Sequence, residues 1–381
     1  MLCIRNGIIH DMVNPEAYEG DILMDGGKIT AIGKNLDIPE GAQVYDADGK
    51  DVYPGFVDAH SHLGLDGYGI GFEGQDYNER NDICTPQLRG IDSFNPMDPS
   101  VAMAAKGGVT CVGTGPGSSN VLGGTFFAVK TAGHCVDDMI VKNPIAMKCA
   151  FGENPKRCYK DVNNYARMST ASKLREMLMR AQDYKARKEA AGDDPLKRPA
   201  FDMKLEAMIP VLEKKIPLKA HAHQANDILT AIRIAKEFDV DMTLEHCTEG
   251  HLIVDEMVKA GFPCAVGPSF GNATKVELKN KTWETPGILA AAGCQVSIIT
   301  DAPVTPQQYL PLCAGFAVKA GMDPYEALKA ITINPAKHLG VADRVGSQEV
   351  GKDGDVVVFE GSPMEIASKP LLVVINGEKI S

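Results

Sequence analysis

Residues 54–62 read Pro-Gly-Phe-Val-Asp-Ala-His-Ser-His, and no other stretch says more about the fold. The apolar pair Phe56-Val57 leads into a predicted β-strand that ends in two histidines. Alternate residues of a strand point to the same face, so His60 and His62 would present two imidazoles side by side. That spacing suits the chelation of one metal ion.

Three later predicted strands also end on side chains that can bind a metal. The sequence His221-Ala222-His223 follows the run 216–220, His246 closes the run 240–245, and Asp301 closes the apolar run 296–300. Core packing does not explain four strand ends of this kind, whereas a shared metal site does.

This order of motifs resembles the amidohydrolase superfamily, on the strings PGFVDAHSHLG, KAHAH, EHC and TDAP. Within it, the chain is most similar to the imidazolonepropionase-like and Xaa-Pro-dipeptidase-like branch. The resemblance covers nearly the whole chain. It implies a metal-dependent hydrolase on a (β/α)8 barrel, with an HxH on the first strand, histidines on the fifth and sixth, and an aspartate on the eighth.

Bulk composition excludes several classes of protein. A chain of 381 residues predicts one large domain and an accessory one. A formal net charge of −11 argues against nucleic acids and anionic membranes as partners. We expect no secretory signal and no transmembrane helix, because neither pattern is visible. The 10 cysteines form no CxxC pair and predict reduced thiols in the cytoplasm.

Both ends of the chain read as short strands separated by turns such as Asn6-Gly7 and Asn376-Gly377. Neither end has enough strands for an independent sheet, so we expect residues 1–52 and 343–381 to share one small composite β-sandwich. The resemblance implies the same arrangement.

Residues 53–342 alternate between strand and helix patterns, which is typical of a parallel (β/α)8 TIM-like barrel. After the first strand, we expect strands at 108–113, 126–129, 145–151, 218–221, 240–246, 263–266 and 296–300. The clearest helix is predicted over 170–191, with Ser169 or Thr170 as its N-cap.

Active sites of such barrels lie at the carboxyl ends of the strands, where all these candidate ligands fall. His60, His62, His221, His246 and Asp301 form a set that suits a divalent metal, most simply zinc, with one or two ions per chain. The metal would activate water and polarise a carbonyl. By resemblance, Asp301 binds metal weakly and carries a proton from the water to the leaving amine. Its alternative role is a helix N-cap.

The roles of the other histidines are less uniform. By resemblance, His221 is a metal ligand and His223 lies nearer the substrate, although a hydrogen-bonded buried imidazole explains His223 equally well. His246 is a ligand or, beside a single ion, a catalytic contact to the substrate. Related deaminases place an acid at or just beyond position 223, where this chain has His223-Gln224-Ala225.

A site with two ions needs a bridging anion after the fourth strand, and two residues qualify. Glu153 lies just past the strand and resembles the glutamate of the sugar-amide deacetylases. Lys148 lies inside the strand, near the place where dipeptidase relatives carry a carboxylated lysine. We expect Glu153 to be the ligand; the alternatives are a loop residue paired with Lys156 or Arg157, and an outward-pointing Lys148.

The sequence therefore predicts a hydrolase that cleaves a C–N bond in an amide, cyclic amide or dipeptide with metal-activated water. An aminohydrolase of a heterocycle and a non-catalytic structural homologue are the alternatives. The partner is a small-molecule substrate, and a homo-oligomer is left open. Long connections at 66–98 and 269–286 suggest lids, in which Tyr68, Phe72, Phe270 and Trp283 are candidates to close the pocket.

Overall fold

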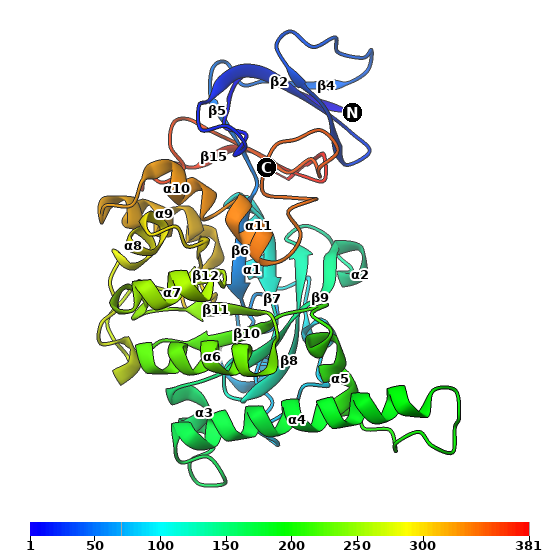
Figure 1. Cartoon of the computed structure of the whole chain (residues 1–381). Helices are drawn as coiled ribbons and strands as arrows, with labels where there is room; N and C mark the ends of the chain where they lie inside the picture. The colour runs from blue at the N-terminus through cyan, green and yellow to red at the C-terminus, as the bar shows by residue number, and fades with distance from the viewer. Residues whose placement is uncertain (70, 381) are drawn as a thin grey trace.

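The structure is a computed structural model that describes residues 1–69 and 71–380. Its strands form two eight-stranded sheets, one built from the two ends of the chain and one that curls into a barrel. Figure 1 shows the terminal sheet at one end of the barrel, with both chain termini in it.

The terminal sheet joins strands that lie more than three hundred residues apart in the sequence. Its order is β16-β15-β14-β5-β1-β2-β3, and β4 pairs with β1. Strand β5 and strand β14 meet antiparallel, with Val52 opposite Val358. The strands are β1 (Leu2–Ile9), β2 (Tyr18–Asp25), β3 (Lys28–Gly33), β4 (Gln43–Asp46), β5 (Asp51–Pro54), β14 (Val356–Phe359), β15 (Pro370–Ile375) and β16 (Glu378–Lys379). Hydrogen bonds thus connect the predicted strands of both ends into one sheet.

The second sheet is the expected barrel, nearly closed. It runs in sequence order through β6 (Phe56–Ser61), β7 (Val109–Thr114), β8 (Leu122–Lys130), β9 (Ile140–Ala150), β10 (Leu218–Ala222), β11 (Met242–His246), β12 (Cys264–Val266) and β13 (Val296–Ile298). Two backbone hydrogen bonds join the segments that follow β13 and β6 and so close the barrel. Asp301 N donates to His60 O at 3.2 Å, and His62 N donates to Ala302 O at 2.8 Å.

One strand of the barrel departs from the all-parallel prediction. Strand β8 pairs antiparallel with both β7 and β9. Its connections, residues 115–121 and 131–139, are too short for the crossover that parallel neighbours require. The third strand therefore forms a meander with its neighbours instead of a βα unit.

Helices surround the barrel (Figure 1). They are α1 (Pro99–Lys106), α2 (Val136–Met139), α3 (Glu153–Cys158), α4 (Arg167–Ala191), α5 (Met203–Leu212), α6 (Ala225–Phe238), α7 (Val254–Ala260), α8 (Thr285–Ala291), α9 (Leu310–Lys319), α10 (Pro324–Lys329) and α11 (Ile333–His338). Short 3-10 turns are η1 (Phe72–Gly74), η2 (Gly90–Ser93), η3 (Gly250–Leu252), η4 (Val276–Leu278) and η5 (Gln307–Tyr309).

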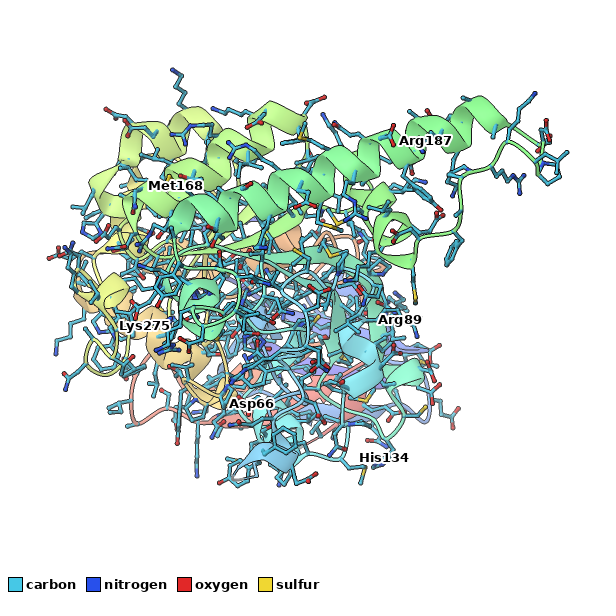
Figure 2. All side chains as sticks on the ribbon, turned by 90° about the horizontal axis from the view of Figure 1, so that it is seen from below. Asp66, Arg89, His134, Met168, Arg187 and Lys275 are labelled. Atoms are coloured by element: carbon cyan, nitrogen blue, oxygen red, sulfur yellow. The ribbon has the colours of Figure 1, made fainter. Side chains whose placement is uncertain are left out.

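The long helix α4 packs on the body over most of its length, and its C-terminal end, where Arg187 lies, projects beyond it (Figure 2). Its predicted cap was wrong. The N-cap is Ala166, which has no capping side chain, while Thr170 is buried inside the first turn and accepts a hydrogen bond from Asn164 Nδ2 at 2.9 Å. Among the described residues, no helix combines the length and the apolar character that crossing a membrane requires.

Candidate active site

A pocket of about 360 Å³ lies at the carboxyl ends of the barrel strands. The long connections at 66–98 and 269–286 both contribute to its walls. Of the four aromatic residues expected to close the pocket, only Phe270 lines it. Tyr68 and Phe72 are exposed to solvent outside the pocket lining, and Trp283 stacks on Phe316. Its base is formed by residues predicted as site residues, namely His62, His221, His223 and Asp301.

The first group of candidate ligands combines β6 with the end of β13. His60, His62 and Asp301 bring three ligand atoms within 4.8 Å of one another. Asp301 Oδ1 lies 3.6 Å from His60 Nε2 and 3.4 Å from His62 Nε2. The alternation of strand β6 places both histidines on the inner face, as the sequence predicts.

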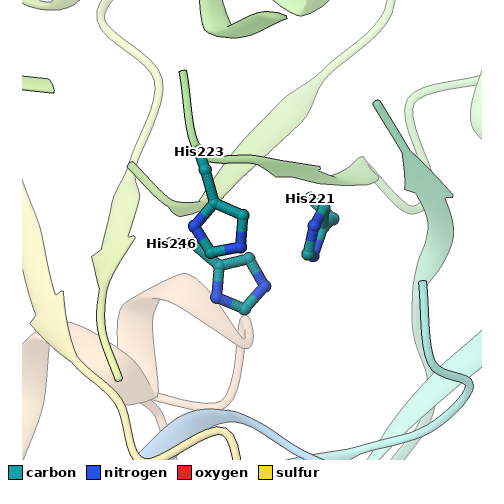
Figure 3. A group of neighbouring side chains, drawn as sticks. All are labelled: His221, His223 and His246. Atoms are coloured by element: carbon teal, nitrogen blue, oxygen red, sulfur yellow. The ribbon is translucent and has the colours of Figure 1, made fainter. Parts of the chain in front are cut away.

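The second group consists of His221, His223 and His246, whose ligand atoms also lie within 4.8 Å of one another. Figure 3 shows the rings of His223 and His246 stacked, with the His221 ring facing them. The ring centroids of His221 and His246 are 4.3 Å apart, and those of His223 and His246 are 4.6 Å apart.

Lys148 and the His60–His246 contact join the two groups into one centre. The rings of His60 and His246 are 5.0 Å apart, and Lys148 Nζ lies 3.1 Å from His60 Nε2. Lys148 is fully buried in β9, and this burial lowers the pKa of its amine to about 8. The alternative of an outward-pointing Lys148 does not hold.

Several buried atoms of this centre have no hydrogen-bond partner among residues 1–69 and 71–380. They are His221 Nδ1, His246 Nε2 and Asp301 Oδ1. An unpaired buried polar atom costs about 1–3 kcal/mol, so three of them in one centre favour a bound ligand. Imidazole nitrogens with a carboxylate oxygen are a donor set that a divalent transition metal fits.

The protonation states agree with that fit. Burial lowers the pKa of His246 to about 4 and lowers the pKa values of His60, His221 and His223 well below the usual value. These imidazoles are therefore neutral, as metal ligands must be. Burial alone would raise the pKa of Asp301, but the neighbouring His246 and His62 hold it below its usual value, so the carboxylate is ionised.

Two residues of the centre, His246 and Asp301, have positive backbone φ angles, which affect the direction of their side chains. His246 has φ 72° and Asp301 has φ 51°, a region that residues other than glycine seldom adopt. At the end of β11 this turn lets the consecutive residues Glu245 and His246 both contact His60, which a regular strand would forbid. Such strain is typical of functional sites.

Glu245 is a site residue that the sequence analysis did not single out. Its carboxylate is fully buried and accepts from His60 Nδ1 at 3.0 Å and from Lys219 Nζ at 2.9 Å. The Nε2 atom of His338 lies 2.9 Å from the other carboxylate oxygen. The only sequence signal was an acid directly before a candidate ligand.

Glu153, the expected bridging ligand, lies outside both groups. It begins α3, and its carboxylate is 3.4 Å from the backbone N of Glu277. Glu277, which no sequence pattern indicated, stands closer to the histidines: its Oε1 is 3.7 Å from His223 Nε2 and 3.9 Å from His221 Nε2. Lys275 Nζ donates to the same oxygen at 2.7 Å.

Comparison with known proteins supplies the remaining observation. A model of the amidohydrolase family matches residues 52–380. A solved amidohydrolase from Thermotoga maritima MSB8 is 39% identical, with a TM-score of 0.96 and 100% of both chains covered.

Two curated relatives are also similar. Amidohydrolase tasK of Hapsidospora irregularis is 30% identical over 94% of this chain, which spans 39% of that protein's length. The imidazolonepropionase of Streptomyces griseus is 24% identical, over 93% of this chain and 89% of that protein.

Proposed function

Because the chain belongs to the amidohydrolase family, we propose that it is a metal-dependent hydrolase that cleaves the C–N bond of an amide, cyclic amide or dipeptide. One observation carries this proposal. Two groups of buried histidines, with orphaned nitrogens and an ionised aspartate, lie together at the base of a pocket.

We propose that two divalent ions, most simply zinc, occupy this centre. His60, His62 and Asp301 would hold one, and His221 and His246 the other. Lys148 is better placed than Glu153 to bridge them, because its Nζ lies beside His60 Nε2 while Glu153 contacts a backbone amide. Its amine would add to CO2 and release a proton, which gives the bridging carbamate.

When bound, the ions would lower the pKa of a water toward about 7 and polarise the substrate carbonyl. Asp301 would accept a proton from that water, since its carboxylate is ionised and its Oδ1 lacks a hydrogen-bond partner among the described residues. The same carboxyl group would then pass the proton to the leaving amine. His223 would contact the substrate with Nε2, because its Nδ1 is 2.7 Å from Thr248 Oγ1.

Deamination of a heterocycle is less well supported. Glu277 does bring an acid beside His223, from another part of the chain than related deaminases use. Burial would raise the pKa of Glu277, but His223 and Lys275 hold it below its usual value. The carboxylate therefore stays ionised and would have to take up a proton before it could donate one. Release of ammonia distinguishes the two reactions.

The test combines metal analysis with a substrate screen. Protein purified without chelator should contain close to two transition-metal ions per chain. It should hydrolyse members of a library of amides, lactams and dipeptides, lose this activity with chelator, and regain it with zinc, manganese or iron. Fully active protein without metal would refute the proposal.

We also propose a reducing compartment such as the cytosol, since all ten cysteines are free thiols.

A further inference from the structure

The pocket above the histidines carries four basic side chains, and only Lys275 pairs with a carboxylate of residues 1–69 and 71–380. Lys275 Nζ pairs with Glu277 at 2.7 Å, and Lys281 Nζ donates to Phe270 O at 2.8 Å. Arg80 and Arg157 also line the pocket. Neither guanidinium lies within 4.0 Å of a carboxylate of residues 1–69 and 71–380.

Hydrogen bonds join the two backbone segments that carry these arginines into one wall of the pocket. Tyr159, two residues after Arg157, donates its hydroxyl to Asp82 O at 3.0 Å and approaches Glu79 O at 3.5 Å, next to Arg80. The end of α3 is therefore tied to the segment that carries Arg80.

The neighbouring loop completes that wall. Ser119 N donates to Asn78 Oδ1 at 3.1 Å, and Asn154 Nδ2 donates to Ser118 Oγ at 2.8 Å. Asn78, Ser118, Ser119 and Asn154 all line the pocket together with the two arginines.

The chain has 50 acidic residues against 39 basic ones. Acids are thus plentiful, yet none neutralises this wall. A guanidinium offers a planar set of donors that matches a carboxylate. The carboxylates of Asp66 and Asp301 line the same pocket and disfavour a dianion such as a phosphate ester.

We propose that the substrate is an amide bearing a carboxylate, which Arg80 and Arg157 bind while the scissile bond lies over the histidines. This inference rests on the proposed hydrolase function and adds the class of substrate. N-acyl amino acids, dipeptides and lactams with a carboxylate belong to this class, whereas neutral amides do not.

The first experiment measures binding without hydrolysis. N-tosylalanine is a sulfonamide that an amide hydrolase does not cleave, and N-ethyl-p-toluenesulfonamide is its counterpart without the carboxylate. By calorimetry, the protein should bind N-tosylalanine about 10- to 100-fold more tightly, as expected for a charge-assisted hydrogen-bonded pair. Arg80→Gln with Arg157→Gln should remove most of this preference.

Two control variants lose the same charge elsewhere. Lys156→Gln lies on α3 beside Arg157 but outside the pocket lining, and Arg187→Gln lies on the projecting end of α4 (Figure 2). Both should keep the wild-type preference. Equal affinity for the two sulfonamides, no binding of N-tosylalanine, or an equal loss for both in the double variant would overturn the proposal.

The second experiment uses turnover. N-acetylalanine should have a higher kcat/KM than N-acetylalaninamide, and the double variant should raise KM for the acid by about 10- to 100-fold with a smaller effect on the neutral amide. If neither compound nor any library amide is hydrolysed, the hydrolase proposal fails, while the calorimetric preference still decides the carboxylate site by itself.

Discussion

His60 has a partner at each ring nitrogen. Nδ1 faces Glu245 at 3.0 Å, and Nε2 faces Lys148 at 3.1 Å. A carboxylate behind a histidine fixes the tautomer, with the proton on the nitrogen that faces the carboxylate. Glu245 therefore determines that His60 presents an unprotonated Nε2 to the centre, and it also neutralises the buried ammonium of Lys219.

Replacing Glu245 tests this role. Glu245→Gln leaves Lys219 without a buried counter-charge, which should lower the free energy of unfolding by about 3–5 kcal/mol. It should also weaken metal binding about 10- to 100-fold, because His60 loses its orienting carboxylate. Urea unfolding and metal titration measure the two effects. The surface variant Glu19→Gln, which loses only an exposed pair with Lys34, should change neither; wild-type values for Glu245→Gln would refute the role.

A pair of variants decides between the two bridging candidates. Lys148→Ala should lower the metal content, and Glu153→Ala should leave it unchanged, because only Lys148 lies among the histidines. Bicarbonate should speed reactivation of the apo-protein, and acetate should partly rescue Lys148→Ala. The reverse metal counts would return the bridge to Glu153, and full metal in both variants would indicate a single ion.

Asp301 is the candidate proton carrier. Asp301→Asn keeps the shape of the side chain but removes the acceptor, so kcat should fall by about 10²–10⁴-fold. Circular dichroism should show an unchanged fold. Because Asp301 is also a candidate ligand, metal content must be measured in the same samples. Turnover close to wild type would leave Asp301 with a purely structural role.

At the scale of elements, Lys130 connects the barrel to the terminal sheet. This buried side chain of β8 pairs with Asp355 at 2.6 Å and with Asp353 at 3.0 Å. Asp353 also accepts from Lys28 at 2.6 Å and from Arg344 at 2.8 Å. The cluster gathers charges from both sheets and from the segment after α11.

Removing Lys130 should make the fold sensitive to acid. Burial would raise the pKa of Asp353, but Lys130 and Lys28 hold it below its usual value. A carboxyl group with a lowered pKa in the folded state stabilises the protein above about pH 3.9, and this contribution is lost as the pH falls through the folded pKa. Lys130→Met raises that pKa, so acid unfolding should begin at a higher pH.

Circular dichroism during acid titration measures this shift, and Lys34→Met, whose partner Glu19 is exposed, is the matched control. At neutral pH, Lys130→Met should also lower the free energy of unfolding by about 3–5 kcal/mol, because buried carboxylates lose their cation. An acid transition at the wild-type pH would show that the cluster does not stabilise the junction.

Which elements could be predicted from the sequence follows from the range of the interactions that form them. Local patterns were enough for the barrel strands and for α4, because alternation and helical spacing act over neighbouring residues. Local patterns did not predict the direction of β8, because the residue pattern of a strand is the same for parallel and antiparallel pairing. Only the short connections on either side decide the direction. The predicted cap of α4 was wrong because the helix begins earlier, at Arg167, and the Thr170 hydroxyl inside its first turn accepts a hydrogen bond from Asn164.

The same distinction applies to the site. Histidines at the ends of predicted strands can be recognised from their spacing in the sequence. The sequence therefore predicted His60, His62, His221 and His246 as candidate ligands. Glu277 could not, because it reaches the histidines from η4 after a long connection, and no repeat or spacing marks it. Lys148 was named only as an alternative, since whether a strand lysine points into a barrel depends on its register.

At the scale of the whole molecule, the terminal sheet depends on both ends of the chain. Strand β14 lies between β5 and β15, so removing it exposes the edge of β5. A chain that stops before Val356 should therefore be insoluble or aggregate, because unpaired strand edges recruit one another. The soluble fraction after expression and size-exclusion chromatography measure this.

A shorter deletion provides the control for that truncation. Strand β16 is a two-residue edge strand, and a chain that ends at Asn376 should remain soluble. A soluble and fully active protein that lacks everything from Val356 onward would show that the N-terminal strands do not need their C-terminal partners.

The shared sheet also determines how long the N-terminal strands must wait for their partners during synthesis. Lys28 and its partner Asp353 are separated by 325 residues. At a synthesis rate of about 5–20 residues per second, the first strands leave the ribosome on the order of 15–65 seconds before their last partners are made. During that interval the apolar side chains of β1 and β2 lack Val356, Val358, Leu372 and Val374, which belong to the same core cluster. The time for which a nascent chain needs a chaperone is therefore governed by the speed of translation through the barrel.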